Sequence, residues 1–130
     1  MTQLQCKISD VVLRKPRGLS SRLFFCVYSG PNAIAFARLS SRTSAPAKHA
    51  RSEQDVPGVS YCLKNIEVSQ NYRNKGIGSA LLDEIIHFCK DERVSSIYGE
   101  AKGNISVLRR WYEQKGFELD NTNNIQLSLP

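Results

Sequence analysis

The fold of this chain is decided by the stretch Ile66-Glu67-Val68-Ser69-Gln70-Asn71-Tyr72-Arg73-Asn74-Lys75-Gly76-Ile77-Gly78. It runs from an apolar strand, through a turn, into a basic glycine-containing loop that opens a long amphipathic helix. Glycine at positions 76 and 78 removes the Cβ atoms that would keep a ligand away from the backbone. The unpaired amides and the positive end of the helix dipole then favour a phosphate group. The stretch predicts an anion site with Arg73 and Lys75 at its rim, although a basic turn before a helix explains the glycines equally well.

Two common phosphate-binding loops do not fit this stretch. A P-loop requires a lysine after its last glycine, but Ser79 follows Gly78 directly. A dinucleotide-binding loop requires a third small residue where Leu81 stands. It also requires an acidic residue about 20 residues after the loop. The sequence has Val94-Ser95-Ser96 in that region. The stretch is therefore neither a P-loop nor a dinucleotide-binding loop.

The composition is that of a globular protein with one domain. A chain of 130 residues suffices for a single core, so we expect one domain over residues 1–130. The amino-terminal residues lack an apolar signal core, and no apolar run approaches the roughly 20 residues that cross a bilayer, so we expect a cytoplasmic protein and no membrane contact.

The four cysteines show no Cys-x-x-Cys spacing; they are Cys6, Cys26, Cys62 and Cys89. They lie in apolar segments, so we expect buried thiols and no metal site.

Periodicity and turn residues predict mostly antiparallel strands followed by the order strand, helix, strand, helix, strand. Strands are expected over residues 4–8, 23–28, 33–39, 61–68, 94–101 and 125–129, with a further one beginning at Phe117. Loops are expected over residues 14–22 and 41–58. A helix after Gly78 should bury Leu81, Leu82, Ile85, Ile86 and Cys89. A second helix, capped at Gly103-Asn104 and ended by Gly116, should bury Val107, Leu108, Trp111 and Tyr112.

Two motifs in this order resemble those of a known family. The run Arg73-x-x-Gly76-x-Gly78 after Ile66-Glu67-Val68 resembles motif A of the GNAT superfamily of acyl-CoA-dependent N-acetyltransferases. Asn104 and the later run Trp111-Tyr112-Glu113-Gln114-Lys115-Gly116-Phe117 resemble its motif B. The resemblance covers residues 33–119 and implies a GNAT-like fold of the α+β (α/β) class. Such a fold has a central mixed, mostly antiparallel, twisted sheet flanked by helices.

The chain departs from the family in its first third. Family members carry two helices between the first and second strands, and these helices wall the acceptor site. Here Leu13 to Arg22 leaves room for at most a turn, so the helix pair is shortened or absent. We therefore expect a more open acceptor groove, or one completed by residues 41–58 or by the second subunit of a homodimer.

The resemblance implies acetyl-CoA as the co-substrate and no metal. The backbone from Ile66 to Val68 would hold the pantetheine arm. The pyrophosphate would bind amides of the loop formed by Arg73, Asn74, Lys75, Gly76, Ile77, Gly78 and Ser79. Asn104 would contact the arm, although it lies eight residues before Tyr112 and seven is usual in the family.

The resemblance also implies catalytic residues. Tyr112 aligns with the family tyrosine that protonates the departing CoA sulfur, while the alternative is that it packs in the core beside Trp111. The general base is less clear. Glu67 on the central strand is the first candidate, Glu100 on the facing strand the second, and an ordered water the third. His49, in the 41–58 loop, and His87, on the polar face of a helix, fit less well.

The function implied is transfer of an acetyl group from acetyl-CoA to a primary amine by direct attack in a ternary complex. The acceptor would be an amine-bearing small molecule, a peptide or a protein. A different function, a non-catalytic CoA-binding or adaptor module, is suggested by the shortened N-terminal region and the lack of an obvious base.

The net charge of +6 leaves a third function open. Residues 1–65 carry ten Lys and Arg against three acids, and residues 66–130 carry eight against nine. A nucleic acid would explain this excess, and so would a solvated face that attracts the polyanionic CoA. No stripe of alternating basic and aromatic residues occurs along the chain, so a nucleic acid partner is the less expected of the two.

Overall fold

The computed structural model of the protein describes residues 2–3, 11–41 and 59–129. The elements in chain order are β1 (Thr2–Gln3), β2 (Val11–Arg14), β3 (Arg22–Ser29), β4 (Asn32–Ser41), β5 (Ser60–Val68), the 3-10 helix η2 (Gln70–Tyr72), α1 (Ile77–Asp91), β6 (Ser96–Glu100), α2 (Ile105–Gln114), β7 (Glu118–Leu119) and β8 (Asn124–Ser128). None of the helices among these residues is long and apolar enough to cross a membrane.

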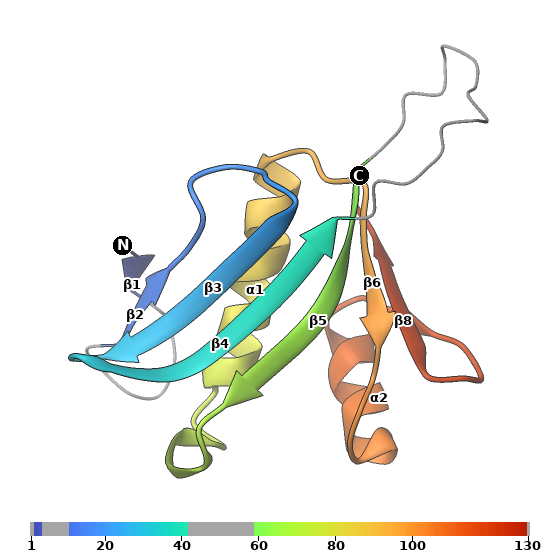
Figure 1. Ribbon diagram of the computed structural model, residues 1–130. Helices are drawn as coiled ribbons and strands as arrows, with labels where there is room; N and C mark the ends of the chain where they lie inside the picture. Colours follow the sequence, from blue (N-terminus) through green and yellow to red (C-terminus); the bar gives the residue numbers. More distant parts are fainter. Residues whose placement is uncertain (1, 4–10, 42–58, 130) are drawn as a thin grey trace.

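The strands form one eight-stranded sheet in the order β1-β2-β3-β4-β5-β6-β8-β7. Neighbouring strands are antiparallel except β5 and β6, which are parallel. Both α-helices lie on the same side of this sheet, α1 behind β3 to β5 and α2 behind β6 and β8 (Figure 1). We call the side that the helices cover the inner face and the opposite side the outer face. The predicted mixed, mostly antiparallel sheet with flanking helices is confirmed.

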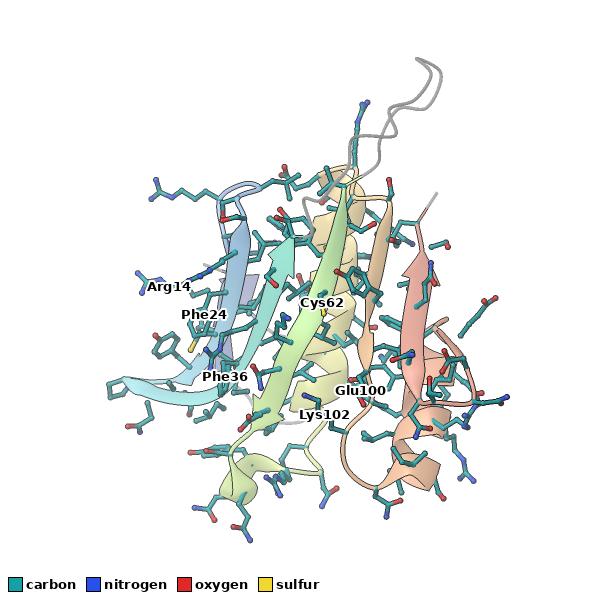
Figure 2. The ribbon with its side chains drawn as sticks, turned by 45° about the vertical axis from the view of Figure 1, so that its right-hand side comes forward. Arg14, Phe24, Phe36, Cys62, Glu100 and Lys102 are labelled. Carbon is teal, nitrogen blue, oxygen red and sulfur yellow. The ribbon has the colours of Figure 1, made fainter. Side chains whose placement is uncertain are left out.

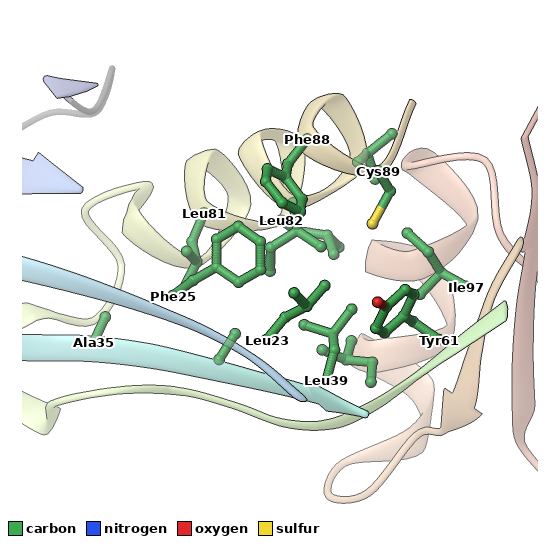
Figure 3. Packing of buried hydrophobic residues seen from close by; sticks show 14 of the residues in the cluster. Leu23, Phe25, Ala35, Leu39, Tyr61, Leu81, Leu82, Phe88, Cys89 and Ile97 are labelled. Carbon is green, nitrogen blue, oxygen red and sulfur yellow. The ribbon is translucent and has the colours of Figure 1, made fainter. Parts of the chain in front are cut away.

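The core lies between the inner face and α1. Alternate residues of β3 and β4 are buried there, among them Leu23, Phe25 and Leu39, and they meet Leu81, Leu82 and Phe88 of α1 (Figure 3). The rings of Phe25 and Phe88 pack edge to face with centroids 5.4 Å apart. Burying such side chains contributes about 1.5–3 kcal/mol each. The helix is therefore held firmly across the strands, which fixes the loop at its start.

Most of the predicted elements are present, with shifted boundaries. The strand β2 was not predicted. It ends at Arg14, the residue at which the sequence suggested that a loop begins. Residues 15–21, between β2 and β3, contain no helix, so the helix pair of the family is missing from this connection. The predicted strand over residues 4–8 and the predicted loop after Ser41 lie outside the described residues.

The prediction for α2 is wrong at one residue. Val107 is 62% exposed, while Tyr112 is buried and Ile105, Leu108 and Trp111 pack partly against the core. Val107 lies in the first turn of the helix, where its backbone amide donates a hydrogen bond to the side-chain oxygen of the N-cap residue Asn104.

The cysteine predictions are partly confirmed. Cys26 and Cys89 are buried free thiols, Cys62 is a half-buried free thiol on β5, and Cys6 is not described. Across the described ranges no group of three or more His, Cys, Asp or Glu side chains is arranged to hold a metal.

Candidate active site

The two parallel strands at the centre of the sheet separate partway along their length. The ladder between β5 and β6 joins Ser60–Leu63 to Ser96–Gly99, whereas β5 continues to pair with β4 as far as Val68. Figure 1 shows the two strands diverging toward the end of the sheet where α1 begins. The backbone of β5 beyond Leu63 thus has an edge that β6 does not cover. An extended ligand could pair with such an edge.

A β-bulge lies at the point of separation. Arg38 of β4 pairs with Asn65 and Leu39 pairs with Leu63, so Lys64 is an extra residue in β5. A bulge bends its strand and increases the local twist. It therefore turns β5 away from β6 just after the last parallel pair.

Gly99 permits the close approach of β6 to β5 at that last pair. A Cβ atom at Gly99 would lie 2.9 Å from the carbonyl oxygen of Leu63, closer than side chains tolerate. The contact joins residues far apart in the chain, so sequence reasoning missed it.

The predicted anion loop lies at the start of α1. Gly76 is the N-cap with φ of 84°, and no side chain caps the helix and no acid lies in its first turn. Asn74 also has a left-handed φ, of 63°. The first amide to bond back into the helix is that of Ala80, which donates to the Gly76 carbonyl at 3.0 Å. The amides of residues 77–79 precede it and have no helical acceptor, so the loop presents a positive helix end suited to an anion.

Arg73 ties this loop to the central strand. Its Nε donates a hydrogen bond to the carbonyl oxygen of Val68 at 3.0 Å. Lys75 is exposed two residues further on. The two cations therefore differ, since Arg73 both carries charge and orients the loop, while Lys75 supplies an exposed charge.

Three elements meet beside the loop. A Cβ atom at Gly78 would lie 3.5 Å from Cγ2 of Val68 and 3.9 Å from Cζ2 of Trp111. The end of β5, the start of α1 and the face of α2 are therefore in contact. Lys115 at the end of α2 adds an ion pair to Asp83 of α1, with 2.8 Å between Nζ and Oδ1.

Tyr112 lies on the buried side of α2, one residue from Trp111. It is 5% exposed and packs against Trp111 and Phe117, with ring centroids 4.9 and 5.4 Å away. Within the described part of the chain its hydroxyl has no hydrogen-bond partner, and burial raises the pKa of the group. Tyr112 thus packs in the core, which was the alternative to the acid role. Its hydroxyl is protonated at neutral pH and can donate a hydrogen bond.

Asn104 is the N-cap of α2. Its Oδ1 accepts a hydrogen bond from the amide of Val107 at 3.4 Å. The capping role foreseen for Gly103-Asn104 is confirmed. This bond uses one lone pair of the side-chain oxygen, so the side-chain nitrogen and the second lone pair of Oδ1 are left to contact a ligand.

A groove of about 900 Å³ runs over the outer face of β5, β6 and β8. Its lining includes Lys64, Glu100 and Lys102. Figure 2 labels Glu100 and Lys102 together with Cys62, which also lines the groove. Glu67 is exposed on β5 opposite Phe36 and is not part of the lining. Of the two carboxylates named from the sequence, the structure brings Glu100 into the groove and leaves Glu67 beside it. His87 is exposed on α1, and His49 lies outside the described residues.

The turn between β7 and β8 contributes Asp120 and Asn124 to the lining of this groove. Asp120 Oδ1 accepts hydrogen bonds from the amides of Thr122 and Asn124 and from the Thr122 hydroxyl, each at 2.9 Å. These bonds, led by that of the Asn124 backbone, lower the pKa of Asp120 to about 2. The turn is therefore held in one conformation by an ionised carboxylate.

The chain is similar to known acetyltransferases in sequence and fold. Residues 5–117 match the family described as the acetyltransferase (GNAT) family. Arabidopsis thaliana NAA60 in complex with acetyl-CoA superposes with a TM-score of 0.67 at 13% identity, covering 82% of this chain and 76% of NAA60. The PaiA N-acetyltransferase of Thermoplasma acidophilum in complex with coenzyme A gives a TM-score of 0.61 at 18% identity, covering 83% and 61%.

A third similar structure contains a peptide. Arabidopsis thaliana Naa50 in complex with the bisubstrate analogue CoA-Ac-MVNAL has a TM-score of 0.62 at 17% identity, covering 82% of this chain and 72% of Naa50. The sequence matches no curated protein.

Proposed function

The chain belongs to the GNAT acetyltransferase family, and on this premise we propose that it transfers an acetyl group from acetyl-CoA to a primary amine. The observation that carries the proposal is the meeting of three features. The start of α1, which no side chain caps, the end of β5 beyond its pairing with β6, and the helix α2, which carries Tyr112 next to Trp111, meet where Val68, Gly78 and Trp111 are in contact. The pyrophosphate of acetyl-CoA would meet the helix start there, the pantetheine arm would meet the edge of β5, and the departing sulfur would meet a proton donor.

The donor half of the site would work through the backbone. The amides of residues 77–79 and the helix dipole would bind the pyrophosphate, with Arg73 and Lys75 adding charge. The uncovered edge of β5 around Ile66 and Val68 would bond the amides of the pantetheine arm. Acetyl-CoA supplies the activated acyl group in this scheme.

Tyr112 would assist the departure of the leaving group. The acceptor amine attacks the thioester carbonyl carbon, the new C–N bond forms and the C–S bond breaks. The hydroxyl of Tyr112 donates a hydrogen bond and then its proton to the sulfur, and solvent returns a proton to the tyrosine. Because burial raises the pKa of Tyr112, the group is in its donating form at neutral pH.

The acceptor amine must lose a proton during the reaction. Glu100 lines the groove, so we favour it, acting directly or through a water, over Glu67 as the group that accepts this proton. Glu67 stays a second candidate because it lies on the same outer face of β5.

We propose that the acceptor is an amine of a peptide or protein. The groove is open and is lined by charged and polar side chains of both signs, which suits a flexible polar chain better than a small apolar amine. The peptide portion of the analogue bound to Naa50 supports the same class. The cytoplasm is the compartment we propose for this reaction.

A non-catalytic CoA-binding module is the second candidate, favoured by the missing helices between β2 and β3. One experiment separates the two. The protein is incubated with acetyl-CoA and a panel of peptides and small amines, and release of the CoA thiol and acetylation of each amine are measured. Acetylation of any panel member above the rate without protein supports the enzyme. Binding of acetyl-CoA without acetylation of the panel would favour the binding module.

A further inference from the structure

The outer face of β2, β3 and β4 carries an aromatic and arginine surface outside the groove. Phe24 on β3 is 53% exposed, and its ring stacks on that of Phe36 of β4, with centroids 6.1 Å apart and planes at 28°. The guanidinium of Arg38 lies over the Phe36 ring, 5.5 Å from its centroid. Arg14 extends from the neighbouring β2 on the same face (Figure 2).

The strand register assembles this surface. Arg14 pairs with Cys26, which pairs with Phe36, and Phe24 pairs directly with Arg38. Paired residues of neighbouring strands point to the same side of a sheet. The residues are 24 positions apart at most in the chain, yet they form one patch. Aromatic and basic residues that do not alternate along the sequence are thus interleaved across the strands.

The charge of the surface has one sign. The strands β2, β3 and β4 contain three arginines, at positions 14, 22 and 38, and no Asp or Glu. The nearest acid in the register is Glu67 of β5, opposite Phe36, and the carboxylates of the groove lie beyond it on β6 and β7. The outer face is therefore divided into a basic aromatic half and a groove half that contains acids.

We propose that this basic aromatic half binds single-stranded nucleic acid. Flat rings exposed on the face of an antiparallel sheet stack nucleobases, and neighbouring arginines contact the phosphates between them. Phe24 presents the exposed ring, Phe36 on the neighbouring strand stacks on it, and the guanidinium of Arg38 lies over the Phe36 ring. Every base has a face that can stack, so we expect little sequence preference.

Two other occupants fit the surface less well. A second copy of the chain using the same patch would bring two sets of three arginines together, with Glu67 beside Phe36 as the nearest acid of each set, and this excess of positive charge opposes a symmetric dimer. An acidic peptide would match the charge. However, the groove that could enclose a peptide lies over β5, β6 and β8, and this half of the face contributes none of its lining.

Fluorescence anisotropy with labelled single-stranded RNA and DNA of about 12 nucleotides, a length within the usual site sizes, tests the proposal. We expect saturable binding that is tighter for single strands than for a duplex of the same sequence. RNA binding tighter than DNA binding would identify RNA as the ligand, and the reverse would identify DNA. Phe24→Ala should weaken binding by about 5-fold to 150-fold, the loss expected for one stacked base, while Phe24→Tyr should retain it.

The salt dependence tests the arginines. Arg38→Ala should reduce the slope of log affinity against log salt by about 0.7, the value for one phosphate contact on a single strand. Arg110→Ala removes the same charge from an exposed position on α2 and should leave the slope unchanged. Val107→Ala is the matched apolar control for Phe24→Ala. The same variants should bind acetyl-CoA with the affinity of wild type. A failure of the nucleic-acid proposal can therefore be distinguished from a failure of the proposed acetyltransferase function.

Several results would overturn the proposal. One is the absence of saturable binding to either single strand at low salt. A second is equal affinity for duplex and single strand, and a third is loss of affinity in the control variants as large as in Phe24→Ala. Sedimentation that shows a dimer of wild type and a monomer of Phe24→Ala would assign the surface to self-association instead. If Phe24→Ala does not fold by circular dichroism, Arg38→Ala and Phe24→Tyr decide the question.

Discussion

Gly99 and the Leu63 carbonyl oxygen are so close that a methyl group on Gly99 would lie 2.9 Å from that oxygen. The contact lies at the last residue pair of the parallel ladder, where β5 and β6 separate. It therefore sets the width of the opening that would receive the pantetheine arm.

Replacing Gly99 should damage both the sheet and the donor site. Gly99→Ala must push β5 and β6 apart, and we expect the free energy of unfolding to fall by about 1–3 kcal/mol. The affinity for acetyl-CoA should fall as well. Denaturant unfolding and calorimetry measure the two effects. Gly18→Ala is the matched control, because nothing lies within 4 Å of a Cβ atom there. Equal stability of the two variants would contradict the role given to Gly99.

Tyr112 should matter for rate and not for binding. Tyr112→Phe removes a hydroxyl that has no partner among the described residues, so stability should stay the same or rise slightly. The turnover number with a peptide acceptor should fall about 100-fold, the lower part of the range for acid catalysis. Steady-state kinetics with calorimetry of acetyl-CoA separates the two quantities. Tyr28→Phe, on β3, serves as the control, and unchanged turnover of Tyr112→Phe would refute the acid role.

The two candidate bases should differ in effect. Glu100→Gln should lower kcat/KM by about tenfold or more, as expected for loss of a group that accepts a proton. Glu67→Gln should have a smaller effect, since Glu67 does not line the groove. The pH profile of kcat/KM for both variants is the measurement. A larger loss in Glu67→Gln would return the base role to the residue first favoured from the sequence.

The place of the glycine loop at the start of α1 and the core face of that helix could be predicted because their signals are local. Gly76 and Gly78 are two residues apart, and Leu81, Leu82, Ile85, Ile86 and Cys89 recur at helical spacing. The helix was expected after Gly78 and begins two residues earlier, at Ile77. The packing of Tyr112 beside Trp111 was also foreseen, as one of two alternatives, because it follows from helical spacing; its role as an acid stays a prediction.

Features that depend on strand register could not be predicted. The bulge at Lys64 and the contact of Gly99 with Leu63 join strands that are distant in the sequence. The stacking of Phe24 on Phe36 arises in the same way, from a hairpin register that carries a bulge of its own. Val107 was placed in the core because helical spacing alone does not show which side of a first turn faces solvent.

The β7–β8 turn should loosen in acid. The folded-state pKa of Asp120 is about 2, below its ordinary value of 3.8, because the Asn124 and Thr122 donors bond its ionised form. A lowered pKa contributes stability that is fully present above about pH 3.8 and is lost as the pH falls through about 2. Chemical shifts of the Thr122 and Asn124 amides should follow this titration. An amide titration centred at the ordinary carboxyl pKa would show that the turn does not depend on these bonds.

Calorimetric titration of the folded protein with acetyl-CoA tests the central claim most directly. We expect saturable binding of one acetyl-CoA per chain, with a Kd of about 1–100 μM, in the lower part of the usual range of enzyme–substrate constants. Arg73→Ala should weaken it more than Lys75→Ala does, because Arg73 also holds the loop against Val68. Gly18→Ala should bind as wild type does. No detectable binding to folded wild-type protein at high micromolar acetyl-CoA would contradict the account of this site.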